Sequence, residues 1–183
     1  MKRVVCCDGA LQKLLSLNII PDVVVGDGDS MDCGELMRHK IPYHADKSEE
    51  YNDLQKALKY CMAKGYDNIL LMGCGGLRED HFIANLSIMA MYSEEMQLTM
   101  LTEHGVFNVM RGTASFNALP GMQVSVFTRS PHTKLSFTGL KYPVNNRSFN
   151  WLWEGSLNEA EGEEFVVEAN DEEPVFVYRA ING

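Results

Sequence analysis

A short run of β-branched residues that ends in glycines and carboxylates constrains this chain more than any other stretch. Val23, Val24 and Val25 favour a buried strand, because branching at Cβ suits a pleated surface. Gly26-Asp27-Gly28-Asp29 follows at once, and its glycines allow a tight loop. Open α/β sheets bind their ligands at the carboxyl ends of strands. The stretch therefore predicts a ligand site around Asp27 and Asp29.

The two carboxylates of this loop repel each other unless a cation or a proton lies between them. Mg²⁺ that carries a phosphate group is the simplest partner, because hard oxygen ligands suit this ion. An acidic surface turn has the same composition, so the residues alone leave both interpretations open. A predicted strand over residues 2–7 ends at Asp8, and a predicted helix over 11–17 leads back to the valine run. Since strand–helix–strand units pair in parallel, we expect Asp8 at the same sheet edge.

A helix is predicted from residue 52 or 53 to 64, because Leu54, Ala57, Leu58 and Cys61 recur with helical spacing. Asp53 stands at or near its start. It can contribute a third carboxylate to the metal site, or it can simply cap the helix.

A glycine-rich loop links a predicted strand over 68–72 to a predicted helix over 82–91. Backbone N–H groups of Gly75 and Gly76 at such a position suit an anion. Arg78 can bind a phosphate through two parallel hydrogen bonds, and Asp80 and His81 can hold a metal or position a hydroxyl. The alternative is a capped helix start with a surface ion pair.

After residue 103 the helical spacing stops and alternating strand patterns begin, separated by turn residues. We therefore predict two domains: residues 1–105 form an α/β domain with a mainly parallel, Rossmann-like sheet, and residues 106–183 form an all-β sandwich or barrel. The predicted strands of the second domain cover residues 106–110, 115–118, 123–128, 134–138, 164–169 and 175–180.

Composition narrows the class of protein. The formal net charge of −9 argues against nucleic acid as a partner. No apolar run is long enough to span a membrane, and the apolar start is too short for a signal peptide. Five cysteines without a CxxC motif argue for reduced thiols, so we expect a cytoplasmic protein.

Several motifs, taken in order, make the chain similar to the thiamine pyrophosphokinase family, and they extend over nearly its whole length. Asp8-Gly9-Ala10 resembles the family's Asp-Gly-Gly-Ala turn. The loop from Gly26 to Ser30 resembles Gly-Asp-x-Asp-Ser, which usually has a bulky residue where Gly28 stands. Residues 50–53 resemble Asp-x-Thr-Asp, with Glu50 and Asn52 as substitutions, and residues 76–85 resemble Gly-Gly-Arg-x-Asp-His-x-x-x-Asn, with Leu77 for the second glycine.

The predicted second domain carries two further matches. Residues 138–142 resemble the family's Gly-Leu-Lys-aromatic element. Residues 155–159 resemble its Gly-(Thr/Ser)-Ser-Asn-Glu loop, with Leu157 at the usual serine position.

The resemblance implies an enzyme that transfers the pyrophosphoryl group of ATP to the hydroxyl of thiamine, giving thiamine diphosphate and AMP. It implies a homodimer with shared active sites, and Mg²⁺ held by Asp27, Asp29 and Asp53. Arg78 would steady phosphate oxygens, and Asp53 or Asp80 would accept the hydroxyl proton. The remaining nucleotide-binding positions implied are Asp8, Gly26, Ser30, Gly75, Gly76, His81 and Asn85.

Thiamine is a cation with two aromatic rings, so aromatic side chains suit its pocket. We expect Trp151 or Trp153, together with Ser156 and Asn158, to bind it; core or interface packing is the alternative for either tryptophan. Two other functions stay open: a catalytically decayed paralogue that binds thiamine or nucleotide, and a different Mg²⁺-dependent phosphotransferase. We expect no nucleic-acid or membrane partner.

Overall fold

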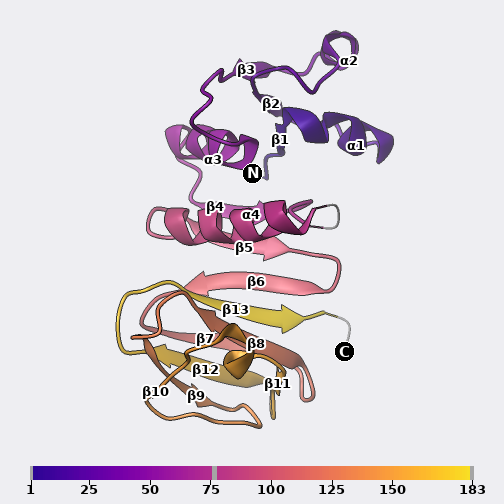
Figure 1. Ribbon diagram of the computed structural model, residues 1–183. Coiled ribbons are helices and arrows are strands. Elements are labelled where there is room, and N and C mark those ends of the chain that lie inside the picture. The colour runs from indigo at the N-terminus through magenta and orange to yellow at the C-terminus, as the bar shows by residue number, and fades with distance from the viewer. Residues whose placement is uncertain (1, 76–77, 182–183) are drawn as a thin grey trace. The chain divides into compact units, whose positions relative to one another are not determined.

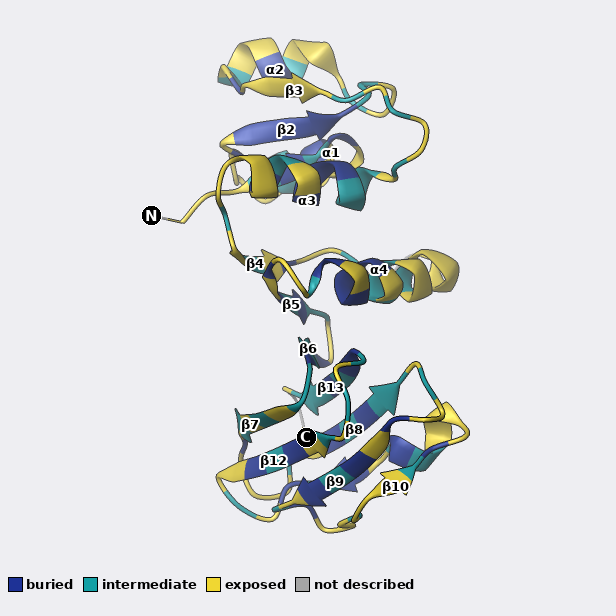
Figure 2. Ribbon diagram, turned by 90° about the vertical axis from the view of Figure 1, so that its left-hand side faces the viewer, coloured by how far each residue is buried: buried dark blue, intermediate teal, exposed yellow. Residues whose placement is uncertain are grey.

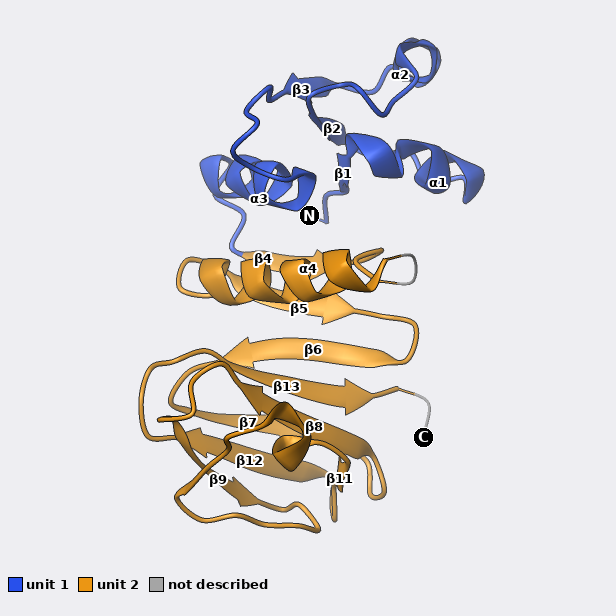
Figure 3. Cartoon of the chain, viewed as in Figure 1, with its two compact units in different colours: residues 1–67 blue, residues 68–183 orange. Residues whose placement is uncertain are grey.

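A computed structural model describes residues 2–75 and 78–181 of the chain (Figure 1). It divides into two compact units, residues 1–67 and 68–183 (Figure 3). None of the helices in the described part of the chain has both the length and the apolar character needed to cross a membrane.

The first unit is a three-stranded parallel sheet with helices in its connections. The strand order is β1-β2-β3, with Val5 opposite Val23 and Val25 opposite His44. The parallel pairing that the strand–helix–strand pattern predicted is thus confirmed for these strands. The elements are β1 (Val5–Cys7), the 3₁₀ helix η1 (Asp8–Ala10), α1 (Leu11–Ser16), β2 (Val23–Gly26), α2 (Cys33–His39), β3 (Tyr43–Ala45) and α3 (Asp53–Ala63).

The central strand β2 is buried along its whole length (Figure 2). An apolar cluster that includes Val24 and Leu11 packs around it, because α1 and the start of α2 close over the sheet. Helix α3 packs on β1 and β2 through a buried face that includes Leu58 and Cys61. The carboxyl ends of β1 and β2 are therefore held side by side.

The second unit consists of two sheets and one long helix. The six-stranded sheet has the order β11-β8-β13-β6-β5-β4, and the four-stranded sheet has the order β10-β9-β12-β7. The elements are β4 (Asn68–Leu71), α4 (Glu79–Tyr92), β5 (Gln97–Leu101), β6 (Gly105–Met110), β7 (Thr113–Asn117), β8 (Gln123–Thr128), β9 (Lys134–Thr138), β10 (Arg147–Ser148), the 3₁₀ helix η2 (Leu152–Gly155), β11 (Asn158–Glu159), β12 (Glu164–Ala169) and β13 (Val175–Ala180).

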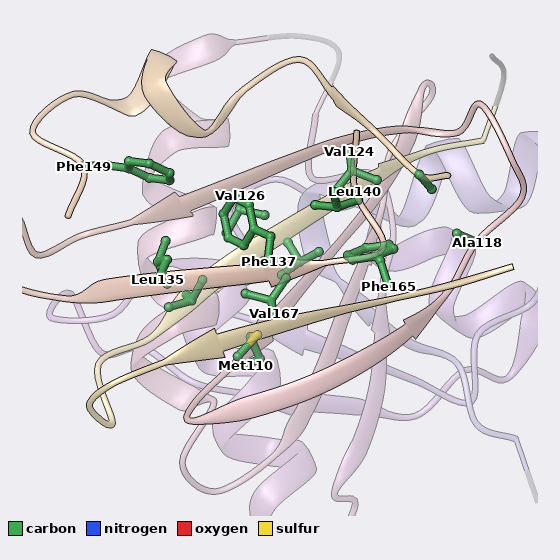
Figure 4. Packing of buried hydrophobic residues seen from close by; sticks show 13 residues of the cluster. Met110, Ala118, Val124, Val126, Leu135, Phe137, Leu140, Phe149, Phe165 and Val167 are labelled. Atoms are coloured by element: carbon green, nitrogen blue, oxygen red, sulfur yellow. The ribbon is translucent and has the colours of Figure 1, made fainter. Parts of the chain in front are cut away.

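Alternating apolar residues of both sheets form the core of this unit (Figure 4). Val126 on β8 lies in it with Phe137 on β9 and Val167 on β12, and all three are at most 5% exposed. This is the arrangement that a period-two pattern dictates when one face of each strand is buried. The β-rich character predicted for the C-terminal part, as a sandwich or a barrel, is confirmed, and its strands form two sheets that share this core.

The mainly parallel sheet expected over residues 1–105 is confirmed only in part. β1, β2 and β3 pair in parallel, and so do β4 and β5. β5 then pairs antiparallel with β6, so the six-stranded sheet is mixed and runs across residue 105. A short hairpin between these strands, in which Thr102 accepts from the N–H of Gly105, explains the antiparallel pairing.

Most element positions agree with the periodicity, and the misses are short. Helix α4 begins at Glu79, three residues before the predicted start, because polar residues occupy its first turn. β10 and β11 have two residues each, too few to show an alternating pattern.

Candidate active site

Asp8 is a buried carboxylate, 1% exposed, placed directly after β1. Its two oxygens accept backbone hydrogen bonds from the N–H of Gly9 (2.7 Å) and of Gly28 (3.0 Å). The Asp8 side chain lies against Gly26, where an added Cβ would come within 2.4 Å of Asp8 Cγ. Glycine at position 26 is thus required by this close approach, and Asp8 ties the ends of β1 and β2 together.

Three carboxylates converge at these strand ends. One oxygen each of Asp8, Asp27 and Asp29 lies within 4.8 Å of the other two. Asp27 Oδ1 accepts from the N–H of Asp29 (3.2 Å), and the hydroxyl of Ser30 donates to Asp29 Oδ1 (2.7 Å). Since carboxylate oxygens are the ligands that Mg²⁺ prefers, these residues fit that ion. The expectation that the acidic loop and Asp8 share one sheet edge is met by this geometry.

A lysine that the sequence reasoning missed lies beside the carboxylates. Lys56, on α3, is only 3% exposed, and its ammonium donates to Asp27 Oδ2 at 2.7 Å. Its Nζ is 3.7 Å from Asp53 Oδ1. Asp53 is thus next to the lysine, and among the described residues it is not part of the close carboxylate group. Lys56 lies away from the stripe of Leu54, Ala57, Leu58 and Cys61, so the helical pattern of α3 gave no signal for it.

Asn52, and not Asp53, is the N-cap of α3. The Asn52 side chain accepts from the N–H of Gln55, and the Gln55 side-chain oxygen Oε1 accepts from the N–H of Asn52. Asp53 is therefore free of the capping role that was its alternative interpretation.

The two carboxylates beside Lys56 have pKa values that move in opposite directions. The hydrogen bond from Lys56 lowers the pKa of Asp27 below its usual range. Burial, reinforced by the nearby Asp8, raises the pKa of Asp53. The site thus holds one carboxylate stabilised as an anion and one with a stronger affinity for a proton.

Tyr43, on β3, is a second residue that the sequence reasoning did not single out. Its hydroxyl donates to the carbonyl oxygen of Gly26 (2.9 Å). Gly28 has a φ of +90°, and a Cβ built there would lie 2.8 Å from the Tyr43 hydroxyl. Gly28 is therefore matched to Tyr43, and a bulky residue at position 28 is excluded while Tyr43 keeps this place.

In the second unit, Arg78 and Asp80 form a two-point ion pair at the start of α4. Arg78 Nε donates to Asp80 Oδ1 at 3.0 Å and Nη2 donates to Oδ2 at 2.6 Å. Both side chains are exposed, and the Arg78 hydrogen bonds lower the pKa of Asp80.

A side chain of α4 contacts the start of the glycine-rich loop. Asn85 donates to the carbonyl oxygen of Cys74 (3.2 Å), which ties α4 to the loop after β4. Gly75 and His81 are exposed, whereas Gly76 and Leu77 lie outside the described residues.

Two exposed tryptophans belong to the η2 segment: Trp151 is its N-cap, and Trp153 lies within it. Trp151 and Trp153 are 69% and 72% exposed, so neither packs in the core of the unit. Leu157 is 78% exposed and has a φ of +59°, which is strained for a bulky side chain. A cavity of about 240 Å³ lies beside this segment, lined in part by Phe149, Trp151 and Leu152.

The polar residues next to the tryptophans hold the loop in shape. The Ser156 hydroxyl donates to the carbonyl oxygen of Trp153 (2.7 Å). Asn158 is 5% exposed and exchanges two hydrogen bonds with the backbone of Tyr142. Its amide is therefore committed to the protein backbone.

Comparison with known proteins assigns both parts of the chain to one family. Residues 1–100 match the family model described as thiamin pyrophosphokinase, catalytic domain, and residues 105–178 match the model described as thiamin pyrophosphokinase, substrate-binding domain. Both models describe parts of one class of enzyme, a kinase with separate catalytic and substrate-binding domains. The chain belongs to the thiamin pyrophosphokinase family, and its enzymatic activity is that of a thiamine diphosphokinase.

Solved structures share the fold at low sequence identity. Thiamine pyrophosphokinase from Bacillus subtilis is 20% identical, with a TM-score of 0.82 over 98% of this chain and 87% of that chain. Thiamin pyrophosphokinase from Candida albicans is 19% identical, with a TM-score of 0.85 over 99% of this chain and 82% of that one. The yeast enzyme is 14% identical, with a TM-score of 0.78 over 97% and 78%. A search of curated proteins gave no match.

Proposed function

We propose that this protein is a Mg²⁺-dependent enzyme that transfers the pyrophosphoryl group of ATP to the hydroxyl of thiamine, forming thiamine diphosphate and AMP. The observation that carries the proposal is the convergence of Asp8, Asp27 and Asp29 at adjacent strand ends in a chain of this family. A buried carboxylate beside two more accessible ones presents a set of oxygen ligands that suits a divalent cation.

Asp27 and Asp29 are the proposed metal ligands, and Asp8 is the third carboxylate of the close group. Asp53, which lies beside Lys56, is proposed as a more distant ligand. Mg²⁺ bound there would neutralise charge on the triphosphate. The chain's part is to hold the carboxylates in place before substrate arrives. Two backbone N–H groups fix Asp8, and Lys56 fixes Asp27. Such preorganisation is the main protein contribution to phosphoryl-type transfer.

Asp53 is the better candidate for the residue that accepts the thiamine hydroxyl proton. Its raised pKa brings it closer to the working pH, as general base catalysis favours, whereas Asp80 is paired with Arg78 and has a lowered pKa. As the proton moves to Asp53, the hydroxyl oxygen bonds to the β-phosphorus. The bond from the β-phosphorus to the oxygen that bridges it to the α-phosphorus breaks, and AMP leaves with that oxygen.

Nucleotide contacts are proposed within each unit, taken by itself. Gly26 and Ser30 belong to the acidic loop, and Gly75, Gly76, Arg78, His81 and Asn85 to the loop before α4 and to that helix. The fork of Arg78 already binds a carboxylate at two points, which is the geometry that a phosphate requires. Asp80 would give up this pair when phosphate oxygens bind Arg78.

Trp151 and Trp153 are the proposed thiamine contacts. Their exposed rings can stack on the aromatic rings of thiamine and attract its charge, each contact contributing about 0.5–2 kcal/mol. Ser156 and Asn158 would act by shaping the loop, because their polar atoms bond to backbone groups.

Self-association is proposed on the same surface. Trp151, Leu152, Trp153 and Leu157 are all at least 66% exposed and lie within seven residues. Several large exposed apolar side chains in one short segment are typical of an interface. We therefore propose a cytoplasmic homodimer with shared active sites.

We also keep the functional division of the chain as a proposal: residues 1–105 bind ATP and the metal on a Rossmann-like sheet, and residues 106–183 bind thiamine and form the dimer. The parallel pairing of β1 with β2, β2 with β3 and β4 with β5 supports the first part.

The test is to identify the products. Purified protein with ATP and Mg²⁺ should release AMP only when thiamine is present, in a one-to-one ratio with thiamine diphosphate. Removing Mg²⁺ with a chelator should stop both products, and adding it back should restore them. Saturable thiamine binding without AMP would instead indicate a decayed paralogue. Turnover of another phosphate ester with thiamine ignored would indicate a different phosphotransferase.

A further inference from the structure

Lys56 is a buried lysine that lies beside acidic side chains. Its side chain is 3% exposed, and its neighbours Ala57 and Leu58 on α3 are buried as well. Lysine is almost never buried unless its ammonium is paired. A buried lysine at this position therefore needs partners of opposite charge.

Its partners come from two separate elements. Asp27 belongs to the loop after β2 and accepts the ammonium at 2.7 Å. Asp53 belongs to the first turn of α3 and lies 3.7 Å from the same nitrogen. Lys56 thus joins the acidic loop to the start of α3, and it occupies one oxygen of a proposed metal ligand.

The net charge of the site depends on Lys56. Asp8, Asp27, Asp29 and Asp53 supply four negative charges when ionised, and Lys56 offsets one of them. A divalent metal then leaves a single net negative charge. Without the lysine, two would remain facing the polyanionic triphosphate.

We propose that Lys56 is a positioning residue that sets the balance between metal and nucleotide binding at this site. It holds Asp27 and Asp53 in place and lowers the repulsion of ATP, and it competes with Mg²⁺ for Asp27. This inference rests on the proposed function, because it takes a phosphate ester and Mg²⁺ as the ligands.

Loss of the charge must then act in opposite directions on the two ligands. In Lys56→Met, Mg²⁺ without nucleotide should bind more tightly, because Asp8, Asp27 and Asp29 then face it without a competing ammonium. The KM for ATP should rise, because one more negative charge opposes the phosphates. With an effective dielectric constant of about 20, removing one charge at this site should change the dissociation constant of Mg²⁺ and the KM for ATP by roughly tenfold each. A residue that only stabilised the fold would weaken both ligands together.

The experiment compares the wild type with Lys56→Met, Lys56→Arg and Lys59→Met. Lys59 is the matched control, since it lies one turn further along α3, is exposed, and rests over the ring of Tyr51. Mg²⁺ alone is titrated by calorimetry, and kcat and KM for ATP are measured separately. We expect opposite shifts in Lys56→Met, values near those of the wild type in Lys59→Met, and partial recovery in Lys56→Arg. Unchanged constants in Lys56→Met, or parallel weakening of Mg²⁺ and ATP, would overturn the inference.

Lys56→Met can also fail to fold without metal, because the carboxylates then repel one another. In that case Lys56→Gln replaces it, and the midpoint of thermal unfolding is followed as Mg²⁺ is added. A larger Mg²⁺-induced rise than in the wild type supports the inference, and an equal or smaller rise contradicts it. This arm needs no turnover, so failure of the proposed reaction and failure of the Lys56 inference give different results.

Discussion

The carboxylate of Asp8 lies so close to Gly26 that a β-carbon on Gly26 would sit 2.4 Å from both Asp8 Cγ and Oδ2. Asp8 cannot rotate away without losing its hydrogen bonds from Gly9 and Gly28. We expect Gly26→Ala to lower the free energy of unfolding by about 1–3 kcal/mol, the usual cost of overpacking a filled site. Urea unfolding measures this change, and calorimetry should show weaker Mg²⁺ binding.

Gly9→Ala is the matched control for that substitution. A Cβ on Gly9 would lie 3.8 Å from the Ser30 side chain, which is ordinary contact, and its backbone is not left-handed. Its stability should stay close to that of the wild type. Equal losses in Gly9→Ala and Gly26→Ala would show that the Asp8 contact is not the cause.

Tyr43 and Gly28 should be energetically coupled. Gly28→Ala places a methyl group 2.8 Å from the Tyr43 hydroxyl at a φ of +90°, and we expect a loss of about 1–3 kcal/mol. Part of that loss comes from the positive φ at position 28, and part comes from the close contact with the Tyr43 hydroxyl. In a Tyr43→Ala background only the backbone part should remain, so a double-mutant cycle measured by urea unfolding should give a coupling above about 0.5 kcal/mol. Strict additivity would mean that the hydroxyl does not restrict position 28.

Asn52 departs from the family's threonine, yet the structure gives it a complete capping role. Its side chain accepts from the N–H of Gln55 at the start of α3. Asn52→Ala should destabilise the protein by about 1 kcal/mol, whereas Asn52→Thr should cost less, because a hydroxyl still caps the helix. Urea unfolding of both variants is the measurement. If Asn52→Ala were as stable as the wild type, the cap would have no energetic weight.

The cysteines should differ in reactivity. Burial raises the pKa of the Cys6 and Cys74 thiols to about 11, so at pH 8 only about one molecule in a thousand carries the reactive thiolate. Cys33 is exposed at the start of α2. Iodoacetamide at pH 8, followed by peptide mass spectrometry, should modify Cys33 first, with Cys6 and Cys74 reacting at least about tenfold more slowly. The difference should vanish in 6 M urea; equal rates in the native protein would be the contrary result.

The valine run, the alternating strands after residue 103 and the acidic loop could be interpreted from sequence because each is a local pattern. Four strands, at 123–128, 134–138, 164–169 and 175–180, were located to the residue. The antiparallel step from β5 to β6 was not predictable from strand periodicity, which carries no direction. Long-range pairing decides it.

The site shows the same limit. Asp8, Asp27 and Asp29 were expected together because parallel strands bring their carboxyl ends to one edge. Lys56 and Tyr43 were missed, because their roles depend on where α3 and β3 pack against the acidic loop. Asn158 was chosen for chemistry toward a ligand, and its amide bonds to the backbone of Tyr142.

The most direct test of the account is the rate of thiamine-dependent AMP release by Asp27→Asn in the presence of ATP and Mg²⁺. The substitution removes a charge from the proposed metal site and leaves an oxygen that can still accept from Lys56, so the fold should persist by circular dichroism. Asp67→Asn, an exposed aspartate beyond the far end of α3, is the control. We predict at least a roughly hundredfold loss of rate in Asp27→Asn and none in Asp67→Asn. A near-normal rate in Asp27→Asn would contradict the assignment of the acidic strand-end loop as the catalytic metal site.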